Sequence, residues 1–314
     1  EQTVKSAQQK EESVPGVDVV NAGDNDIKIS RVKVTSSEGQ KAIGKPIGNY
    51  ITLEVQGIKY NDTELYERTC KALAAELGQL LKLNAKSTTL VVGLGNWNVT
   101  PDALGPKVVS KLMVTRHLLQ YVPEEVDRGV RPVCAISPGV LGITGIETSE
   151  IIRGIVDRLR PDCIIAIDAL ASRKLDRVNT TIQISDTGIS PGSGVGNKRT
   201  DISRDTLGVP VIAIGVPTVV DAATIANDTI DKVVDAFIQK SNEGTQFYTM
   251  LKNMDRDEKY QMIQEVLDPY TGNLVVTPKE TDEVVDRIAK VIANGLNISL
   301  HQGITLDDVD RYIQ

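Results

Sequence analysis

The chain is poor in several residue types on which common functional sites depend. Aromatic residues make up 4% of its 314 residues, and it has two histidines, three cysteines and one tryptophan. So few aromatic side chains argue against a surface that stacks nucleic-acid bases. The net charge of -7 argues against the basic face that nucleic-acid binding requires. We therefore expect no direct nucleic-acid partner.

The few cysteines and histidines are not spaced as metal ligands. Cys134 and Cys163 lie within apolar runs, where a free thiol is usually a small buried hydrophobic group, and Cys70 is distant from both. This usage is typical of a reducing, intracellular compartment. Neither His117 nor His301 lies beside a candidate nucleophile. We expect no metal and no other cofactor.

Long apolar runs are missing as well. No stretch has the length of a membrane span, and no signal peptide opens the chain, so we expect no membrane partner. The chain begins at Glu1 without an initiator methionine, and a processed or trimmed form is expected. A hydrophobic content of 40% is enough for the core of one large domain or two modest ones.

Strands and helices alternate through the middle of the chain. Short apolar runs predict buried strands at 89–93, 132–137, 163–168 and 210–216, with helices at 102–121, 147–160 and 222–239. Period-two patterns predict half-buried strands at 27–34, 49–55 and 180–185, and a helix is expected over 61–83. This order implies an α/β fold with a mainly parallel central sheet and helices on both faces.

The two ends of the chain differ from this middle part. Residues 1–26 are polar and are expected to form a frayed helix and a linker. Residues 27–240 form the predicted α/β core. Residues 241–314 are charged, and we expect extra helices there at 257–267, 281–293 and 306–313, packed on the core as an extension.

Two aspartates follow predicted buried strands. Asp102 comes after the strand 89–93 and the loop GLGNWNVTP, and Asp168 ends the run CIIAID. In parallel sheets ligands gather at the carboxyl ends of the strands. Two aspartates that lie close together share a proton, and such a pair can activate water without a metal. A helix cap for Asp102 and a backbone tie for Asp168 are the structural alternatives.

The glycine-rich loops are candidates for binding a ligand. GSGVGNKR offers Gly192, Gly194, Lys198 and Arg199, which could surround an anion or a glutamate side chain, or form only a flexible loop. GLGN lacks the third glycine of a dinucleotide fingerprint. Asp186-Thr187-Gly188 matches the triplet of pepsin-like proteases, but these enzymes need two copies, and an Asx turn explains a single one.

Four segments taken together resemble the germination proteases of spore-forming bacteria. They are GLGNWNVTPDALGP, SPGVLGITGIET, IIAIDALASR and QISDTGISPGSGVGNKR, and they occur in this order between Val91 and Arg199. The resemblance implies an aspartic-type endopeptidase that degrades small acid-soluble spore proteins during germination, in the spore core or forespore cytoplasm. It also implies a fold similar to hydrogenase-maturation endopeptidases, a zymogen with a removable N-terminal segment, and a homotetramer.

The resemblance places the catalytic pair at Asp102 and Asp168. The loops 138–145 and 186–199 are then expected to shape the cleft. Because substrates of the family are cut beside a glutamate, positive charge is expected in the cleft, from Arg173, Lys174, Lys198 and Arg199. The expected substrate-binding residues are Asn96, Gly139, Gly145, Arg173, Asp186, Gly192, Gly194, Lys198 and Arg199.

Three alternatives stay open from the sequence. One is a nickel-dependent maturation endopeptidase, although neither histidine lies in a loop after the Asp168 strand. Another is a non-catalytic nucleotide-binding module that uses GLGN. The third is an inactive, zymogen-like state of the same protease.

Overall fold

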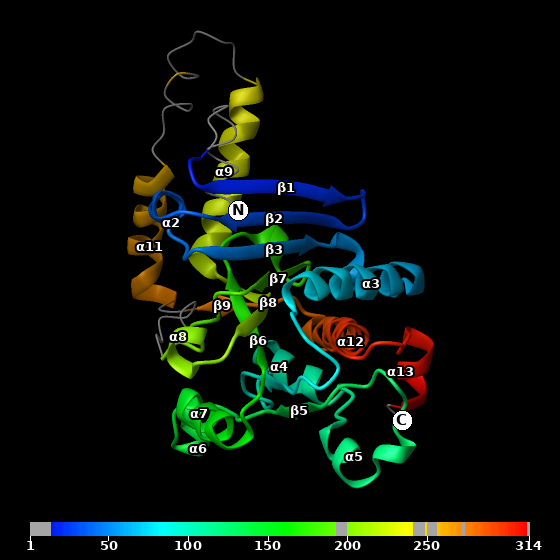
Figure 1. Cartoon of the computed structure of the whole chain (residues 1–314). Helices are drawn as coiled ribbons and strands as arrows, with labels where there is room; N and C mark the ends of the chain where they lie inside the picture. Colours follow the sequence, from blue (N-terminus) through cyan, green and yellow to red (C-terminus); the bar gives the residue numbers. More distant parts are fainter. Residues whose placement is uncertain (1–13, 193–199, 241–248, 250–255, 272–273, 313–314) are drawn as a thin grey trace.

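A mixed sheet forms the centre of the molecule (Figure 1). The computed structural model describes residues 14–192, 200–240, 249, 256–271 and 274–312. Among these residues nine strands form one sheet in the order β1-β2-β3-β7-β8-β6-β4-β5, and β9 pairs with β8. The strands are β1 (Val17–Gly23), β2 (Lys28–Val34), β3 (Gly48–Glu54), β4 (Thr89–Gly93), β5 (Val133–Ile136), β6 (Cys163–Ser172), β7 (Thr181–Ser185), β8 (Val211–Asp221) and β9 (Val275–Val276).

The parallel half of the sheet consists of β8, β6, β4 and β5. Side chains alternate along each strand, so its residues divide between two cores. Val91, Ile165 and Ile167 pack on one face with α3 (Thr63–Leu80), α4 (Leu104–Val109) and α12 (Thr281–Leu300). Leu90 and Ile164 pack on the other face with α7 (Thr148–Leu159) and α8 (Arg204–Leu207). The predicted α/β fold with helices on both faces is confirmed.

The other half of the sheet is antiparallel, so the sheet is mixed rather than mainly parallel. β7 pairs antiparallel with β8 and β3, and β2 and β1 continue the antiparallel pairing beyond β3. The cause is the short connection after β6, which contains only the turn η4 (Leu175–Arg177). A parallel crossover needs a dozen or more residues, so the chain reverses direction here.

Two predictions of local structure are wrong. Val17–Gly23 is the strand β1 rather than helix or linker; it lies at the sheet edge and is mostly exposed, so it lacks a clear apolar alternation. The helix expected over 102–121 is divided into η2 (Thr100–Asp102), α4 and α5 (Arg116–Tyr121). Between them Met113 N donates to Asn297 Oδ1 and Thr115 N to Val133 O, so these amides bond outside a helix.

Helices of the C-terminal third occupy different environments. α12 is buried along most of its length and packs against α3 and α4. α9 (Ala222–Lys240) reaches past β1 in Figure 1, with α11 (Arg256–Thr271) packed beside it. α13 (Leu306–Tyr312) follows α12. The expected C-terminal helices are thus present, while the division into parts 1–26, 27–240 and 241–314 stays a prediction.

The remaining elements are short. No helix within the described ranges combines the length and the apolar character that crossing a membrane requires. The remaining helices and turns are α2 (Ser37–Ile43), η1 (Gln56–Lys59), η3 (Pro123–Glu125) and α6 (Leu141–Thr144).

Candidate active site

Asp168 lies within a central strand of the sheet. Its strand, β6, runs between β8 and β4, with Asp168 opposite Gly215 and Ile167 opposite Gly93. The side chain is 6% exposed, and its Oδ1 accepts a hydrogen bond from Ala169 N at 3.0 Å. β6 does not end at this residue but continues to Ser172. The residues before and after Asp168 are therefore both paired with neighbouring strands, which holds the position of its carboxyl group.

Asp102 is held by the turn that follows β4. The chain bends at Gly95, whose φ of +110° favours glycine, and a Cβ there would lie 2.0 Å from Asp102 O. Asn96 N donates to Asp102 Oδ2 at 2.8 Å. Thr218 Oγ1 on β8 donates to Pro101 O at 2.6 Å, which fastens the turn to the sheet. Asp102 is half-buried in this position.

The two aspartates lie at the same end of the sheet. Leu94 N donates to Ile167 O at 2.8 Å, so the turn carrying Asp102 is bonded to the residue before Asp168. Gly95 in turn contacts Asp102, through the close approach just described. The structure thus places the turn of one aspartate against the strand of the other, although the two residues are 66 positions apart in the sequence (168 − 102). Their catalytic roles stay a prediction.

A cleft of about 440 Å³ opens beside Asp168. Three of the predicted site residues line it, namely Asp168, Arg173 and Gly192. Asp102 is not among the lining residues. Lys45 and Tyr50 line the cleft but were missed by the sequence analysis. They reach it because Tyr50 on β3 pairs with Ser185 on β7, a register that no local sequence pattern reveals.

The cleft alters the acidity of the two side chains that were missed. Burial, and then the charge of Arg173, lower the pKa of Lys45. Burial raises the pKa of Tyr50, and the charge of Asp186 raises it further against an opposing hydrogen bond with Thr187. Both pKa shifts indicate that this wall of the cleft is partly desolvated. A charge bound there is only weakly screened by water.

The other predicted substrate residues that the structure describes do not line the cleft. Asp186 accepts hydrogen bonds from Asn49 N at 2.8 Å and Asn49 Nδ2 at 2.6 Å, which joins the loop after β7 to the start of β3. Asn96 holds Asp102 and also accepts from Asn98 N through its own side chain. Gly194, Lys198 and Arg199 lie outside the described residues. The substrate roles of all these residues stay predictions.

The loop 138–145 follows β5 at the same end of the sheet as both aspartates. β5 pairs in parallel with β4, so the carboxyl ends of these strands are neighbours. Gly139 and Gly145 both have positive φ, and Gly145 ends α6. Large apolar side chains near both turns are exposed: Trp97, Val99, Ile143 and Ile146. An exposed apolar group of this kind is common at a binding surface.

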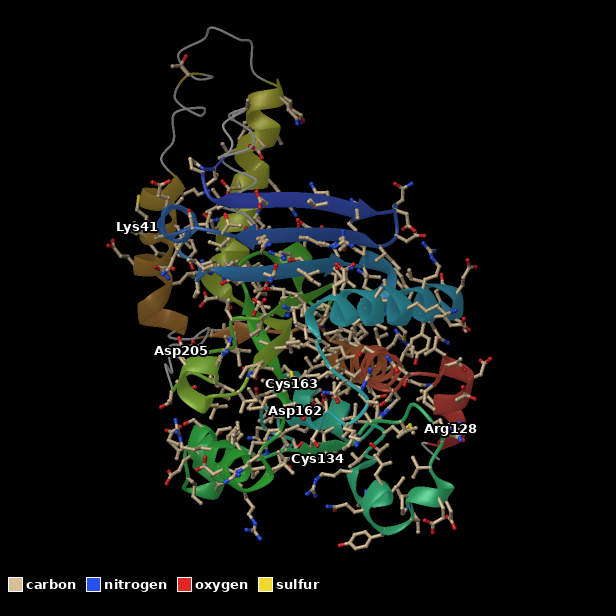
Figure 2. All side chains as sticks on the ribbon, in the orientation of Figure 1. Lys41, Arg128, Cys134, Asp162, Cys163 and Asp205 are labelled. Atoms are coloured by element: carbon tan, nitrogen blue, oxygen red, sulfur yellow. The ribbon has the colours of Figure 1, made fainter. Side chains whose placement is uncertain are left out.

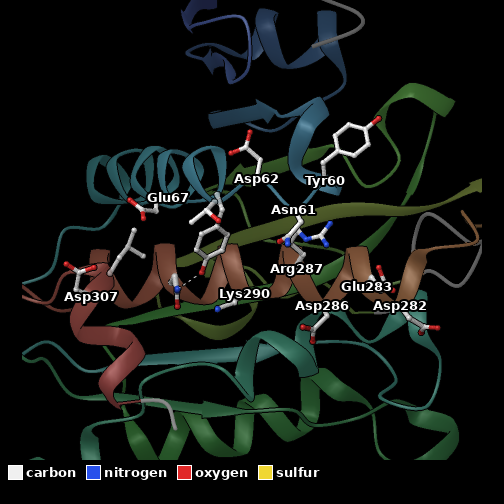
Figure 3. Close-up of a pocket in the computed structure, with 14 residues that line it drawn as sticks. Tyr60, Asn61, Asp62, Glu67, Asp282, Glu283, Asp286, Arg287, Lys290 and Asp307 are labelled. Carbon is white, nitrogen blue, oxygen red and sulfur yellow. Dashed lines mark hydrogen bonds between the residues drawn. The ribbon is translucent and has the colours of Figure 1, made fainter.

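A larger cavity, of about 710 Å³, lies elsewhere in the molecule (Figure 3). It is formed between α3 and α12, where Asn294 donates to the Tyr66 hydroxyl at 2.5 Å. Its charged lining residues are mostly acidic and include Asp62, Glu283 and Asp307. Neither catalytic candidate lines it. The smaller cleft is therefore the candidate site, because it contains Asp168 and the turn with Asp102 is bonded to the same strand.

The cysteines are poor candidates for a nucleophile. Burial raises the pKa of Cys70 and of Cys163 to about 12 and also raises that of Cys134, so the thiols stay protonated near neutral pH. Cys134 and Cys163 lie on strands of the sheet (Figure 2). Within the described part of the chain, no group of three or more His, Cys, Asp or Glu residues is placed to hold a metal ion.

Known proteins resemble this chain over nearly its whole length. The family model for germination protease matches residues 1–253 and 238–313. A germination protease of Clostridium tetani is 57% identical over 300 residues, which cover 96% of this chain and 93% of that protein. A germination protease of Bacillus subtilis is 50% identical over 319 residues, covering 91% of this chain and 86% of that protein.

A solved structure also aligns with this chain. The [NiFe] hydrogenase maturation protease HycI of Thermococcus kodakarensis aligns with 62% of this chain and 99% of its own, at 15% identity and a TM-score of 0.30. The sequence comparisons are far stronger and extend over both aspartates and the loops around the cleft. The chain belongs to the germination protease family.

Proposed function

We propose that this protease cuts small acid-soluble spore proteins during germination and uses Asp102 and Asp168 to activate water. Family membership supports a spore germination endopeptidase. The single observation that carries the aspartic mechanism is the hydrogen bond from Leu94 N to Ile167 O. This bond fixes the turn that carries Asp102 against the strand that carries Asp168.

The proposed chemistry requires one proton between two carboxyl groups. The ionised carboxylate takes a proton from water while the water oxygen attacks the carbonyl carbon of the scissile amide. The protonated carboxyl group donates to the carbonyl oxygen as negative charge develops there. The tetrahedral intermediate then collapses, the C–N bond breaks, and the leaving amine takes up a proton from the carboxyl group that received it from water.

The substrate is proposed to bind across the end of the sheet. The cleft residues Arg173 and Gly192, with Gly194, Lys198 and Arg199 from the same loop, are proposed to hold it, and Arg173 supplies positive charge. Asn96, Gly139 and Gly145 belong to the neighbouring turns, and the exposed side chains of Trp97 and Ile143 support their role in binding. Asp186 is proposed to act by holding β3 in position.

We also propose the assembly and location that the family resemblance implies. The protein would be a homotetramer in the spore core or forespore, formed from a zymogen with a removable N-terminal segment. Exposed apolar side chains on α9 and α11 support self-association: Ile230, Val233, Phe237, Met262 and Val266. Side chains of this kind are commonly covered in an oligomer.

The test replaces each acid by its amide. Asp102→Asn and Asp168→Asn should each lower kcat on a purified small acid-soluble spore protein by at least about a hundredfold, because neither amide can take a proton from water. Asp205→Asn, on the first turn of α8, is the matched control and should leave kcat unchanged. Circular dichroism checks that all three variants are folded. An amide variant with wild-type kcat would refute the mechanism.

A further inference from the structure

The strand β8 contains a bulge next to the turn that carries Asp102. Two adjacent residues of β6 pair with Pro217 and Val219 of β8, so Thr218 is an extra residue in the ladder. Proline lacks the N–H that a ladder bond needs, so inside a sheet it is confined to edge strands, strand ends and bulges. A bulge changes the direction of the side chains around it. Thr218 is 1% exposed, so this bulge encloses a hydroxyl group within the fold.

Three threonine hydroxyl groups connect this bulge with the C-terminal third of the chain. Thr218 Oγ1 donates to Pro101 O at 2.6 Å, one residue before Asp102. Thr277 Oγ1 donates to Thr218 O at 2.9 Å and lies 2.6 Å from Thr281 Oγ1, on the first residue of α12. The turn that carries Asp102 is thus linked, through Thr218, to a residue 176 positions further along the chain (277 − 101).

The two threonines of the C-terminal third are held by elements of their own. β9 pairs antiparallel with β8, with Val276 opposite Val220, and Thr277 follows β9 directly (Figure 1). α12 begins at Thr281, which is 4% exposed, and it packs against η2 as well as α3 and α4. The C-terminal third therefore supports the turn and does more than cover the sheet.

Other hydrogen bonds of this turn are local. Asp102 N donates to Val99 O at 2.8 Å, and Asn96 N donates to Asp102 Oδ2 at 2.8 Å. These bonds fix the shape of the turn but not its distance from β6. Leu94 N holds the beginning of the turn to β6, and Thr218 holds its end to β8. The distance between two carboxyl groups sets how strongly they compete for one proton.

We infer that Thr218 is a positioning residue for Asp102 and is itself held by Thr277 and Thr281. The inference rests on the proposed function, because it requires Asp102 to be catalytic. Thr218 is not among the residues that line the cleft, so a displaced turn should slow the chemical step and leave substrate binding nearly unchanged. A wider separation should also weaken the repulsion between the two carboxylates, which narrows the pH range in which the pair holds one proton.

Kinetics on a purified small acid-soluble spore protein test the inference. Thr218→Val keeps the shape of the side chain but removes the donor, so kcat should fall at least about tenfold while KM changes less than about twofold. The pH range over which kcat exceeds half its maximum should narrow by at least about half a pH unit. Thr218→Ser keeps the hydroxyl group and should restore kcat to within about threefold of wild type.

Two further variants separate positioning from stability. Thr277 is exposed, so Thr277→Val should leave the fold intact but lower kcat about threefold or more. Thr69, buried in α3, donates to Leu65 O at 2.7 Å. Thr69→Val loses a comparable hydrogen bond far from the turn and should keep kcat within about twofold of wild type. Urea unfolding measures the stability of each variant.

Two results would overturn the inference. One is a wild-type kcat and pH profile in Thr218→Val, and the other is an equal loss of kcat in Thr218→Val and Thr218→Ser. If Thr218→Val does not fold, an unchanged kcat in Thr277→Val overturns the inference instead. If Asp102→Asn loses activity but the threonine variants do not, the inference fails and the proposed function stands. If Asp102→Asn keeps wild-type kcat, both fail.

Discussion

The buried histidine at the end of α12 makes the stability of this fold depend on pH. His301 is 1% exposed, and its Nδ1 accepts a hydrogen bond from Arg131 N at 3.2 Å, which requires that nitrogen to be unprotonated. Nε2 lies 3.4 Å from Met113 O and is placed to donate to it. Burial lowers the pKa of His301 to about 4; the Arg131 charge lowers it too, against the opposing hydrogen bond with Met113.

The size and sign of the effect follow from this pKa. The ordinary value is 6.5, so the difference is 6.5 − 4 = 2.5, which corresponds to about 3 kcal/mol of unfolding free energy. The folded state binds the proton more weakly than the unfolded state does. Stability from the neutral imidazole is therefore fully present above pH 6.5, decreases as the pH falls, and is lost below about pH 4. At pH 5 the loss should be about 2 kcal/mol.

Urea unfolding followed by circular dichroism measures this loss. Wild type and His301→Gln are compared at about pH 7.5 and pH 5. The Gln side chain can still accept from Arg131 N but does not titrate, so its stability should fall by about 2 kcal/mol less than that of wild type over this range. His117→Gln, on the exposed surface of α5, is the matched control and should behave as wild type. Equal pH dependence in wild type and His301→Gln would refute the reasoning.

Two further predictions concern a turn and a buried ion pair. Gly95→Ala should lower kcat at least about tenfold and destabilise the fold by about 1–3 kcal/mol. The reason is that φ at this residue is +110° and the new Cβ would collide with Asp102 O. Wild-type kcat in this variant would contradict the role of the turn. Glu76→Gln should cost about 2 kcal/mol in urea unfolding, because it leaves Arg31 without its carboxylate partner at 2.5 Å. A loss below about 0.5 kcal/mol would show that this pair contributes little.

The parallel half of the fold and the position of both aspartates could be predicted from the sequence because the signals there are local. The apolar run before Asp168 and the glycine-bounded run before Asp102 identify two strands that are buried on both faces. Parallel strands have their carboxyl ends at one end of the sheet, which brings both acids there. Family resemblance pointed to the same pair, and the family is confirmed.

The rest depends on contacts between distant parts of the chain. β1 is an exposed edge strand that forms because it pairs with β2, so its sequence VDVVNAG has no distinctive apolar pattern. The apolar spacing over 102–121 is that of a helix, but Asn297 and Val133 take up the amides that would continue it. Lys45 was missed because its place in the cleft follows from the register of β3 against β7.

The continuation of β6 beyond Asp168 makes one of the two proposed catalytic aspartates harder to displace than the other. From Ala169 to Ser172 the strand stays in register with β8 apart from one bulge, so displacing Asp168 would require the middle of the sheet to separate. Asp102 instead lies in a turn outside the sheet, held by bonds that include Asp102 N to Val99 O, Asn96 N to Asp102 Oδ2 and Thr218 Oγ1 to Pro101 O. A movement that changes the separation of the two acids should therefore displace the turn 95–102 more easily than β6, and a reporter group for such a movement belongs there.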